Sequence, residues 1–389
     1  MQFQYYIPTR ILFGAGSLSS LHKQELPGKK ALIVISAGKS MRSNGYLQKV
    51  EHELELAGVQ WVVFDRILPN PIKKHVMEGA ALAREEGCDF VIGLGGGSSI
   101  DSAKSIAVMA ANPGDYWDYI SGGSGKEKPV EAAPLPIVAI TTTAGTGTEA
   151  DPFTVITKED TEEKIGFGCD GTYPVLSVVD PELMLSVPAH LTAYQGFDAL
   201  FHSTEGYINR THNPISDLYA LKAIELLGKN LARAVEDGGD LKAREEVALA
   251  NTLAGMVEST SGCISEHSLE HALSAYHPQM PHGAGLIMIS LAYYTHFAKS
   301  GACDERMVQM AKALGKEDAK EPMDFVVRLA QLQQECHVDA LKMSEYGVDA
   351  ENLKKYAVKA RETMGGLFEV DPAPLSDADS ETILRQSYR

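Results

Sequence analysis

The stretch Leu94-Gly-Gly-Gly-Ser-Ser-Ile-Asp-Ser-Ala-Lys104 decides the fold of the first half of this 389-residue chain. It follows an apolar run at residues 90–94 and opens a segment with helical periodicity at residues 98–111. Glycine lets the backbone turn tightly, and the bare N–H groups at the start of a helix attract an anion. The stretch therefore predicts a strand–turn–helix unit that binds a pyrophosphate. The alternative is a purely structural helix cap formed by Ser98, with Asp101 in the first turn.

Four other short apolar runs indicate that this unit recurs along the first half of the chain. They are rich in β-branched residues and bounded by turn residues, as expected for strands buried on both faces of a parallel sheet. They lie at residues 31–35, 61–64, 137–140 and 176–179. Helical periodicity appears between them at residues 45–58 and 72–87. This alternation predicts an α/β domain with a Rossmann-like parallel sheet over residues 1–188.

The second half of the chain has a different pattern, with apolar residues at helical spacing and few strand signals. The runs lie at residues 192–208, 214–236, 241–260, 283–299, 303–314, 322–335 and 350–365. They predict an all-α domain over residues 189–389, joined to the first domain by the proline-containing stretch 181–188. Clefts between domains commonly hold ligands, so we expect the active site between the two domains.

The composition narrows the class of protein. A formal charge of −17 disfavours nucleic acids and anionic membranes as partners, because both require a basic surface. The five cysteines are odd in number and form no Cys-x-x-Cys pair, which is typical of reduced thiols in a cytoplasmic protein. The amino-terminal residues lack the pattern of a signal peptide, and no apolar run reaches the ~18 residues of a membrane helix. We therefore expect a cytoplasmic protein.

Two pairs of polar residues in the helical half have the i, i+4 spacing that places both side chains on one helix face. They are Asp198 with His202 and His267 with His271, and His282 follows in a Pro-His-Gly turn. One carboxylate with up to three imidazoles suits a divalent ion such as Fe²⁺ or Zn²⁺. Each residue alone would more often be a surface or core group, but their coincidence favours a metal site.

A second glycine-rich turn, Ile140-Thr-Thr-Thr-Ala-Gly-Thr-Gly-Thr-Glu149, follows another predicted strand. Its hydroxyl groups can hydrogen-bond to sugar or phosphate oxygens, and its glycines allow the backbone to approach a ligand. The alternative is a plain β-turn in which the threonines bind their own backbone. The density of threonine and glycine favours ligand binding.

Together these stretches resemble the iron-containing (group III) metal-dependent alcohol dehydrogenase family. Gly95-Gly-Gly-Ser-Ser-Ile-Asp-Ser-Ala-Lys104 matches the family signature GGGSxxDxAK, and Thr142-Thr-Ala-Gly-Thr-Gly-Thr-Glu149 is similar to its second glycine turn. Gly196-Phe-Asp-Ala-Leu-Phe-His202 and Pro281-His-Gly283 are similar to its metal-binding segments. The resemblance extends over nearly the whole chain.

The resemblance implies an architecture like that of dehydroquinate synthase, with a dinucleotide on the α/β domain and a metal on the helical domain. It implies Asp198, His202, His267 and His282 as metal ligands, and it places His271 near the substrate or its proton relay. The nucleotide contacts that it implies are Gly96, Gly97, Ser98, Asp101, Thr142, Thr143, Asn70 and Lys164.

The chain departs from the family pattern by an apparent extra residue between His271 and His282, around His277-Pro278. Either the loop bulges there, or His277 lies near the site as an additional polar group.

The turn after residues 31–35 bears on the choice of nucleotide. Many NAD-dependent members of the family carry an acid here, which binds the ribose hydroxyls and repels a 2′-phosphate. This turn reads Ser36-Ala-Gly-Lys-Ser-Met-Arg42, with two cations and no acid. We therefore expect NADP(H), held by Ser36, Gly38, Lys39 and Ser40. If Lys39 and Arg42 point to solvent instead, NAD remains possible.

The expected reaction is reversible hydride transfer between NADP(H) and a small alcohol, diol or aldehyde, with Fe²⁺ or Zn²⁺ polarising the substrate oxygen. A homodimer is also expected from the resemblance. A dehydroquinate-synthase-like lyase is the first alternative, but the helical half lacks the cationic cluster that its substrate requires. His267-Ser-Leu-Glu-His271 also fits the HxxEH pattern of zinc peptidases, which leaves both glycine turns unexplained. A non-catalytic dinucleotide-binding subunit is disfavoured because all four ligand positions are intact.

Overall fold

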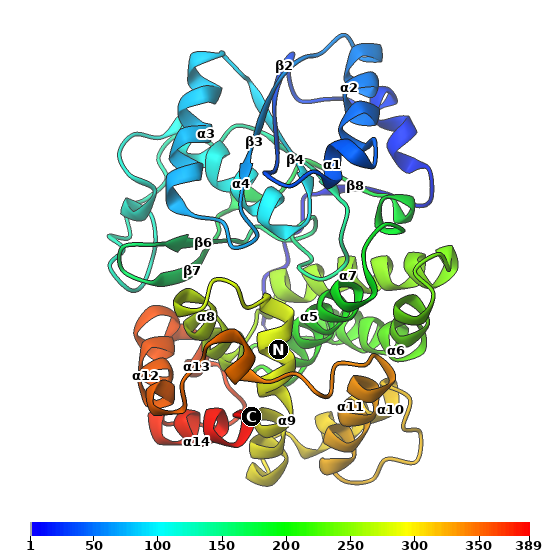
Figure 1. The fold of residues 1–389 in the computed structure, drawn as a ribbon, viewed down its shortest axis with the longest axis vertical. Helices are drawn as coiled ribbons and strands as arrows, with labels where there is room; N and C mark the ends of the chain where they lie inside the picture. Colours follow the sequence, from blue (N-terminus) through cyan, green and yellow to red (C-terminus); the bar gives the residue numbers. More distant parts are fainter. Residues whose placement is uncertain (1) are drawn as a thin grey trace. The chain divides into compact units, whose positions relative to one another are not determined.

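The computed structural model describes residues 2–389, which form two compact units that are considered separately (Figure 1). The α/β unit comprises Ile7–Thr143 and Thr148–Ser186. The helical unit comprises residues 2–6, Ala144–Gly147 and Val187–Arg389. The predicted combination of a parallel α/β half and an all-helical half is confirmed. The exact domain boundary after residue 188 stays a prediction.

A six-stranded parallel sheet forms the centre of the α/β unit, with strand order β1-β8-β5-β4-β2-β3. Five of its strands contain the predicted apolar runs, and the short β1 lies outside them. The strands are β1 (Arg10–Phe13), β2 (Lys30–Ser36), β3 (Gln60–Ile67), β4 (Phe90–Gly95), β5 (Ile137–Thr141) and β8 (Leu176–Val179). Every residue of β4, β5 and β8 is buried, which explains why these strands read as continuous apolar runs.

Helices cover both faces of this sheet, with α2 on one side and α3 and α4 on the other (Figure 1). The α-helices of the unit are α1 (Ser40–Ser43), α2 (Tyr46–Leu56), α3 (Lys73–Glu85) and α4 (Gly97–Ala111). Short 3-10 helices lie at Ser17–Lys23, Tyr116–Asp118, Asp170–Thr172 and Pro181–Met184. The antiparallel hairpin of β6 (Thr154–Lys158) and β7 (Glu163–Phe167) follows β5 and was absent from the sequence-based expectation.

A fully buried lysine joins α4 to the chain that leads into this hairpin. Lys104 Nζ donates to Thr148 Oγ1 at 2.6 Å and to Phe153 O at 2.7 Å. It also lies 3.1 Å from the buried carboxylate of Asp151 and 2.9 Å from the Asp151 carbonyl oxygen. A buried ammonium needs such partners, because its charge is otherwise costly to remove from water.

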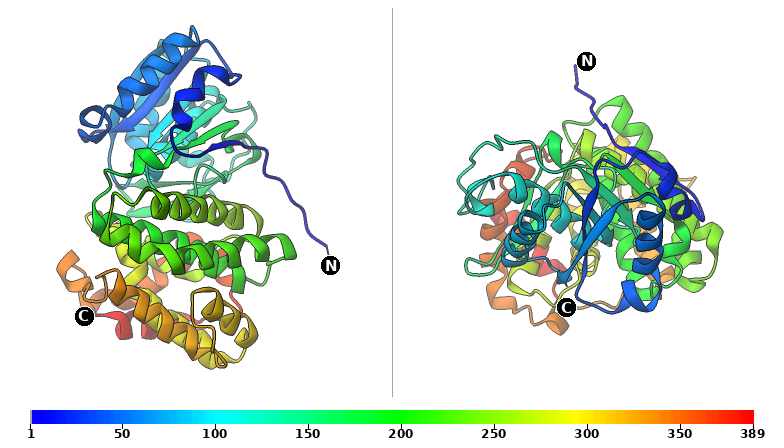
Figure 2. Two further views of the ribbon diagram at one scale, coloured as in Figure 1. Left: turned by 90° about the vertical axis from the view of Figure 1, so that its right-hand side faces the viewer. Right: turned by 90° about the horizontal axis from the view of Figure 1, so that it is seen from above.

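The helical unit consists of ten helices and two short 3-10 segments among the described residues. The helices are α5 (Ala189–Ile208), α6 (Pro214–Glu236), α7 (Leu241–Thr260), α8 (Ser265–Tyr276), α9 (His282–Ser300), α10 (Asp304–Ala313), α11 (Met323–Glu335), α12 (Leu353–Met364), α13 (Gly366–Glu369) and α14 (Asp377–Ser387), and the 3-10 segments are Met343–Tyr346 and Ala350–Asn352. Figure 2 shows the green helices α5, α6 and α7 packed side by side. A Cβ on Gly196 would lie 2.1 Å from Leu231 Cδ1, so a larger residue there would displace the Leu231 side chain where α5 packs on α6.

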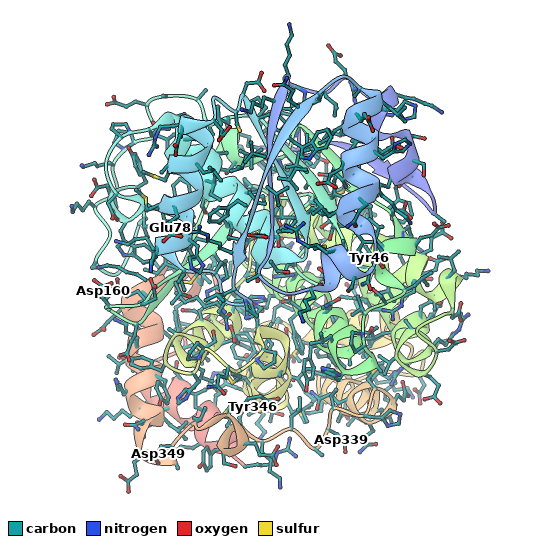
Figure 3. All side chains as sticks on the ribbon, turned by 45° about the horizontal axis from the view of Figure 1, so that its top comes forward. Tyr46, Glu78, Asp160, Asp339, Tyr346 and Asp349 are labelled. Atoms are coloured by element: carbon teal, nitrogen blue, oxygen red, sulfur yellow. The ribbon has the colours of Figure 1, made fainter. Side chains whose placement is uncertain are left out.

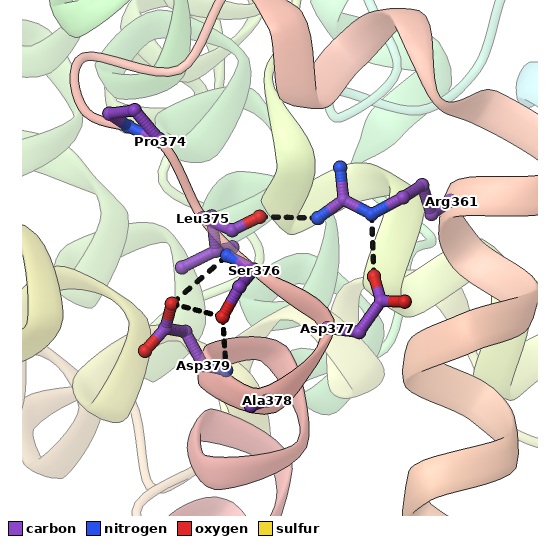
Figure 4. Close-up of a pocket in the computed structure, with 7 residues that line it drawn as sticks. All are labelled: Arg361, Pro374, Leu375, Ser376, Asp377, Ala378 and Asp379. Atoms are coloured by element: carbon purple, nitrogen blue, oxygen red, sulfur yellow. Dashed lines mark hydrogen bonds and ion pairs between the residues drawn. The ribbon is translucent and has the colours of Figure 1, made fainter.

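The start of α14 is held by a network of polar groups (Figure 4). Ser376 caps the helix, because its Oγ accepts from Asp379 N at 3.2 Å while Asp379 Oδ2 accepts from Ser376 N at 3.0 Å. Arg361 of α12 donates to Asp377 Oδ1 at 2.5 Å and to the carbonyl oxygen of Leu375. The surface pocket here is thus built around mutually paired groups.

Acidic side chains lie on the surface of both units, in line with the negative net charge. Figure 3 labels four of them: Glu78 on α3, Asp160 in the turn of the β6–β7 hairpin, and Asp339 and Asp349 in the helical unit. Within residues 2–389, no helix combines the length and the apolar character that a membrane crossing requires.

Candidate metal centre and nucleotide site

Three imidazole rings of the helical unit converge on one carboxylate oxygen. The Nε2 atoms of His202, His267 and His282 lie 3.7, 3.6 and 3.4 Å from Asp198 Oδ1. Asp198 and His202 occupy one face of α5, as their spacing predicted, whereas His267 is on α8 and His282 is the first residue of α9. The structure thus brings together all four predicted metal ligands.

A hydrogen bond at the other ring nitrogen sets the tautomer of each imidazole. His202 Nδ1 donates to the carbonyl oxygen of Gly145 at 3.2 Å. His267 Nδ1 donates to Glu205 Oε1, and His282 Nδ1 donates to Glu270 Oε2. Carbonyl and carboxylate oxygens only accept, so Nδ1 must carry the proton and Nε2 presents its lone pair. Metal-binding histidines in proteins are commonly oriented in this way.

The charges and unsatisfied atoms of this cluster fit a divalent cation. Asp198 Oδ1 and His267 Nε2 are buried, and within residues 2–389 neither atom has a hydrogen-bond partner. Burial lowers the pKa of His202 to about 3, despite the nearby Asp198 carboxylate, so this imidazole is neutral at pH 7. One buried anion surrounded by imidazole lone pairs is a donor set that a divalent cation would satisfy.

A short piece of the threonine–glycine turn supports His202. Ala144–Gly147 belongs to the helical unit, where Ala144 N donates to Gln195 Oε1 at 3.2 Å and Gly147 N donates to Asn251 Oδ1 at 2.9 Å. A Cβ on Gly255 of α7 would lie 2.1 Å from Gly147 O, so the turn packs directly on the helix backbone. The glycines of this motif therefore serve the metal centre as well as the predicted nucleotide site.

Close approach of α9 to α5 brings His282 to Asp198. A Cβ on Gly283 would lie 2.1 Å from the carbonyl oxygen of Tyr194, which only glycine avoids. The Pro-His-Gly sequence thus combines a helix start at Pro281, a ligand at His282 and a contact without a side chain at Gly283.

His271, the predicted substrate-facing histidine, lies one turn beyond His267 on α8. Its ring centroid is 5.2 Å from that of His282, and its Nδ1 lies 3.0 Å from Met364 Sδ. Thioether sulfur is a weak acceptor, so this contact does not orient the ring as a carboxylate would. His277, by contrast, is hydrogen-bonded through Nε2 to Tyr356 Oη at 2.8 Å, which directs it toward α12.

The two predicted nucleotide-binding turns lie together in the α/β unit. Gly95 and Thr141 are paired at the ends of β4 and β5, and Thr142 N donates to Gly95 O at 2.9 Å. A Cβ on Gly96 would lie 2.9 Å from Thr143 Cγ2, so glycine allows the two turns to touch. The N-terminus of α4, with Gly97 and Ser98, follows directly.

Asn70 and Lys164, which are also predicted to contact the nucleotide, lie near the same turns. Ser98 Oγ donates to the carbonyl oxygen of Pro69, next to Asn70, and Thr157 N donates to Pro71 O at 2.8 Å. Lys164 is buried and pairs with Thr157 in the hairpin.

Both carboxylate oxygens of Asp101 accept hydrogen bonds from other protein groups. Its Oδ1 accepts from Thr148 Oγ1 at 2.8 Å and its Oδ2 accepts from Val155 N at 3.0 Å. Burial raises its pKa to about 6, although Lys104 opposes the shift. These contacts hold the hairpin to α4, so a direct role of Asp101 in nucleotide binding stays a prediction.

The predicted 2′-phosphate turn lies beside an acid of another strand, which the sequence of the turn itself did not indicate. Gly38, Lys39 and Arg42 line an open surface pocket together with Asp65 at the end of β3. Arg42 Nη2 lies 2.9 Å from Asp65 Oδ2. The alternation of parallel strands places the ends of β2 and β3 side by side, which could have indicated this contact.

The two carboxylates that orient His267 and His282 were also missed. Glu205 continues the Asp198–His202 face of α5, so the spacing i, i+4, i+7 is the signal that could have found it. In the sequence, Glu270 stands out only as the glutamate of the HxxEH pattern. The structure gives it the different task of binding His282 Nδ1.

Replacing Glu205 by glutamine is expected to lower the affinity for a divalent metal by about 10- to 100-fold. Glu205 accepts from His267 Nδ1 through one oxygen and from Ile264 N through the other, at 2.7 Å for the latter. A glutamine NH₂ group would face one of these donors. Competition with a chromophoric chelator measures the affinity, with Glu225→Gln on the exposed face of α6 as control. An unchanged affinity would show that Glu205 does not support the ligand.

Comparison with known proteins identifies both halves of the chain. Residues 8–181 match the family described as iron-containing alcohol dehydrogenase. Residues 192–388 match the C-terminal domain of the Fe-containing alcohol dehydrogenase family.

Curated relatives span most of the chain and differ in substrate and nucleotide. The 1,3-propanediol dehydrogenase of Klebsiella pneumoniae is 36% identical over 318 residues, 81% of this chain and 80% of the relative. The NAD-dependent methanol dehydrogenase of Bacillus methanolicus is 35% identical and covers 80% of each chain. The NADPH-dependent butanol dehydrogenase of Clostridium saccharobutylicum is 34% identical over 90% of this chain and 88% of the relative.

The fold is similarly matched by a solved structure. The archaeal halo-thermophilic Red Sea brine pool alcohol dehydrogenase superimposes with a TM-score of 0.94 at 36% identity, over 100% of this chain and 99% of that chain.

Proposed function

This chain belongs to the iron-containing alcohol dehydrogenase family, and on that premise we propose that it interconverts small primary alcohols or diols and their aldehydes with NADP(H). Membership makes it an oxidoreductase of the NAD(P)-dependent alcohol dehydrogenase class. The three relatives named above are propanediol, methanol and butanol dehydrogenases, so a small aliphatic alcohol is the feature that these three share.

The proposal depends chiefly on the convergence of three imidazole Nε2 atoms on Asp198 Oδ1, with each Nδ1 held by an acceptor. We assign Asp198, His202, His267 and His282 as the ligands of Fe²⁺, with Zn²⁺ as the alternative ion. A divalent ion in such a site supplies Lewis-acid polarisation of the substrate oxygen. The protein fixes the ligand orientation through Glu205, Glu270 and the Gly145 carbonyl.

His271 is assigned to the proton that the substrate oxygen gains or loses. It is buried, it follows His267 by one helical turn, and its ring lies beside that of His282. An imidazole can accept or donate a proton near neutral pH, which suits a relay in both directions of the reaction.

For the nucleotide, we assign the pyrophosphate to Gly96, Gly97 and Ser98, with Thr142 and Thr143 beside them. The residues assigned to the remainder of NADP(H) are Ser36, Gly38, Lys39, Ser40, Asn70, Asp101 and Lys164. The preference for NADP(H) is supported by the cations Lys39 and Arg42 in the pocket after β2. Asp65 would repel a 2′-phosphate by itself, but its pairing with Arg42 offsets that charge.

Arg42→Ala is expected to lower kcat/KM for NADPH by about 10- to 100-fold, because a hydrogen bond to a charged group contributes about 1.5–3 kcal/mol. Activity with NADH should change little. Steady-state kinetics with both nucleotides measures the ratio, and Arg66→Ala, which removes an exposed cation on β3, is the control. Asp65→Asn should shift the preference further toward NADPH. Equal losses with both nucleotides would contradict the assignment.

The proposed reaction is tested by following NADPH oxidation with a panel of small aldehydes. The protein is first treated with chelator and then refilled with Fe²⁺ or Zn²⁺, and NADH is run in parallel. Metal-dependent turnover with NADPH supports the proposal. Turnover with NADH alone would contradict only the nucleotide assignment, whereas no nucleotide-dependent turnover with either metal would overturn the proposed activity.

The homodimer, the cytoplasmic location and the active-site cleft expected from the sequence stay predictions. Sedimentation velocity of the metal-loaded protein tests the first of them.

A further inference from the structure

One of the five cysteines lies inside the candidate metal centre. Cys263 Sγ and ring nitrogens of His202 and His267 all lie within 4.8 Å of one another, and all three residues are buried. The other cysteines of residues 2–389 belong to no such cluster of potential ligands. His267 Nε2 is buried and has no hydrogen-bond partner among the described residues.

The backbone around Cys263 is held firmly. Gly262 adopts φ +78°, which ends α7 and turns the chain toward α8. Asn209 Nδ2 donates to the carbonyl oxygens of Ser261 at 2.7 Å and Cys263 at 3.3 Å, and Ile264 N donates to Glu205 at 2.7 Å. The thiol is thus positioned beside the imidazoles by contacts to α5, the helix that carries Asp198 and His202.

The cluster overlaps the ligand set assigned above but differs in chemical character. Asp198, His267 and His282 form one group of mutually close donors, with an oxygen and two nitrogens. His202, Cys263 and His267 form another, with a sulfur and two nitrogens, and Glu258 Oε2 lies 3.7 Å from His202 Nε2 as a further oxygen donor. Both groups require His267, and its Nδ1 is already bound to Glu205. Only His267 Nε2 is left to bind a metal ion. An ion held by one group therefore prevents a second ion from binding to the other group.

We propose that Cys263, His202 and His267 form an alternative ligand set that captures strongly thiophilic divalent ions such as Cd²⁺ through sulfur. This proposal rests on the proposed metal centre, because the two ligand sets share His202 and His267. Soft thiolate ligands favour such ions, whereas carboxylate favours harder ones such as Mn²⁺. The S–H proton is released to solvent as the metal–sulfur bond forms. The centre therefore binds thiophilic ions through the set that contains Cys263 and harder ions through the set that contains Asp198.

The test is a titration of chelator-treated protein with Cd²⁺ and, separately, with Mn²⁺. Wild-type protein is expected to show an ultraviolet thiolate-to-Cd²⁺ charge-transfer band that saturates with one ion per chain. Cys263→Ser should abolish this band and lower Cd²⁺ affinity by at least about tenfold. Loss of a group that merely hydrogen-bonds to a metal ligand already lowers metal affinity by about 10- to 100-fold, so loss of a ligand should cost no less. The Mn²⁺ affinity of Cys263→Ser should stay unchanged. The control is Cys336→Ser, which removes another buried thiol and should change neither the Cd²⁺ band nor the affinity for either ion. Cys263→Ala repeats the test if the serine variant is poorly folded.

The outcomes separate this inference from the metal centre itself. Tight binding of Cd²⁺ without a band that depends on Cys263 would overturn the alternative ligand set and leave the centre intact. An equal loss of Cd²⁺ and Mn²⁺ affinity in Cys263→Ser would also overturn it, because the cysteine would then support the fold of the site alone. Failure of wild-type protein to bind either ion would overturn both the inference and the proposed metal centre.

Discussion

His267→Ala is expected to leave the protein almost without bound metal and to lower kcat for aldehyde reduction by about 10³-fold or more, because Lewis-acid stabilisation is worth several kcal/mol. His267 belongs both to the donor group with Asp198 and His282 and to the donor group with His202 and Cys263. Its loss also leaves the buried Glu205 carboxylate without its imidazole partner. Elemental analysis and single-turnover assays measure the two effects.

The control for this substitution is His337→Ala, because the His337 side chain is 73% exposed and lies outside the centre. His267→Gln tests whether the loss follows from the missing ligand or from a cavity, because glutamine fills much of the volume. Full metal content with normal kcat in both His267 variants would overturn the ligand assignment.

Lys104→Met is expected to lower the free energy of unfolding of the α/β unit by about 3–5 kcal/mol, the usual cost of removing one partner of a buried ion pair. The lost ammonium group binds Thr148, Asp151 and Phe153, and both charged side chains are almost completely buried. Methionine preserves most of the volume, so the loss reports the uncompensated Asp151 charge rather than a cavity. Urea denaturation followed by far-ultraviolet circular dichroism measures it.

Lys126→Met is the matched control for this prediction. Lys126 also contacts a carboxylate, Asp118, at 2.7 Å, but its side chain is 65% exposed, so water replaces the lost interaction. Little change is expected in this variant. If both substitutions destabilise the protein equally, the burial argument for Lys104 is wrong.

Much of the fold could be predicted because it follows from the pattern of apolar and polar residues within short segments of the chain. Runs of four or five mainly apolar residues between helical segments indicated five of the six parallel strands, since a strand buried on both faces needs apolar residues throughout. β1 and the β6–β7 hairpin escaped prediction. β1 has no fully buried residue, and the hairpin contains polar residues whose partners, such as Asp101 for Thr154, lie far away in the chain.

The metal-ligand prediction had a similar local basis. The i, i+4 spacing of Asp198 and His202 places both on one face of α5 whatever the rest of the chain does. That they meet His267 and His282 was an inference from resemblance, because no spacing rule relates residues on different helices.

By itself, therefore, the sequence determined the α/β-then-helical order, the glycine turn at the start of α4 and the shared helix face of Asp198 and His202, because these depend on periodicity and on residue type. Only the tertiary structure decided which groups orient the candidate metal ligands. Glu205 and His267 are 62 residues apart, and Gly145 and His202 are 57 apart. It likewise placed Asp65 against Arg42 and Cys263 against the imidazoles. Hydrogen bonds and ion pairs form between atoms a few ångströms apart, and for these residues that proximity is created by helix and strand packing rather than by position along the chain.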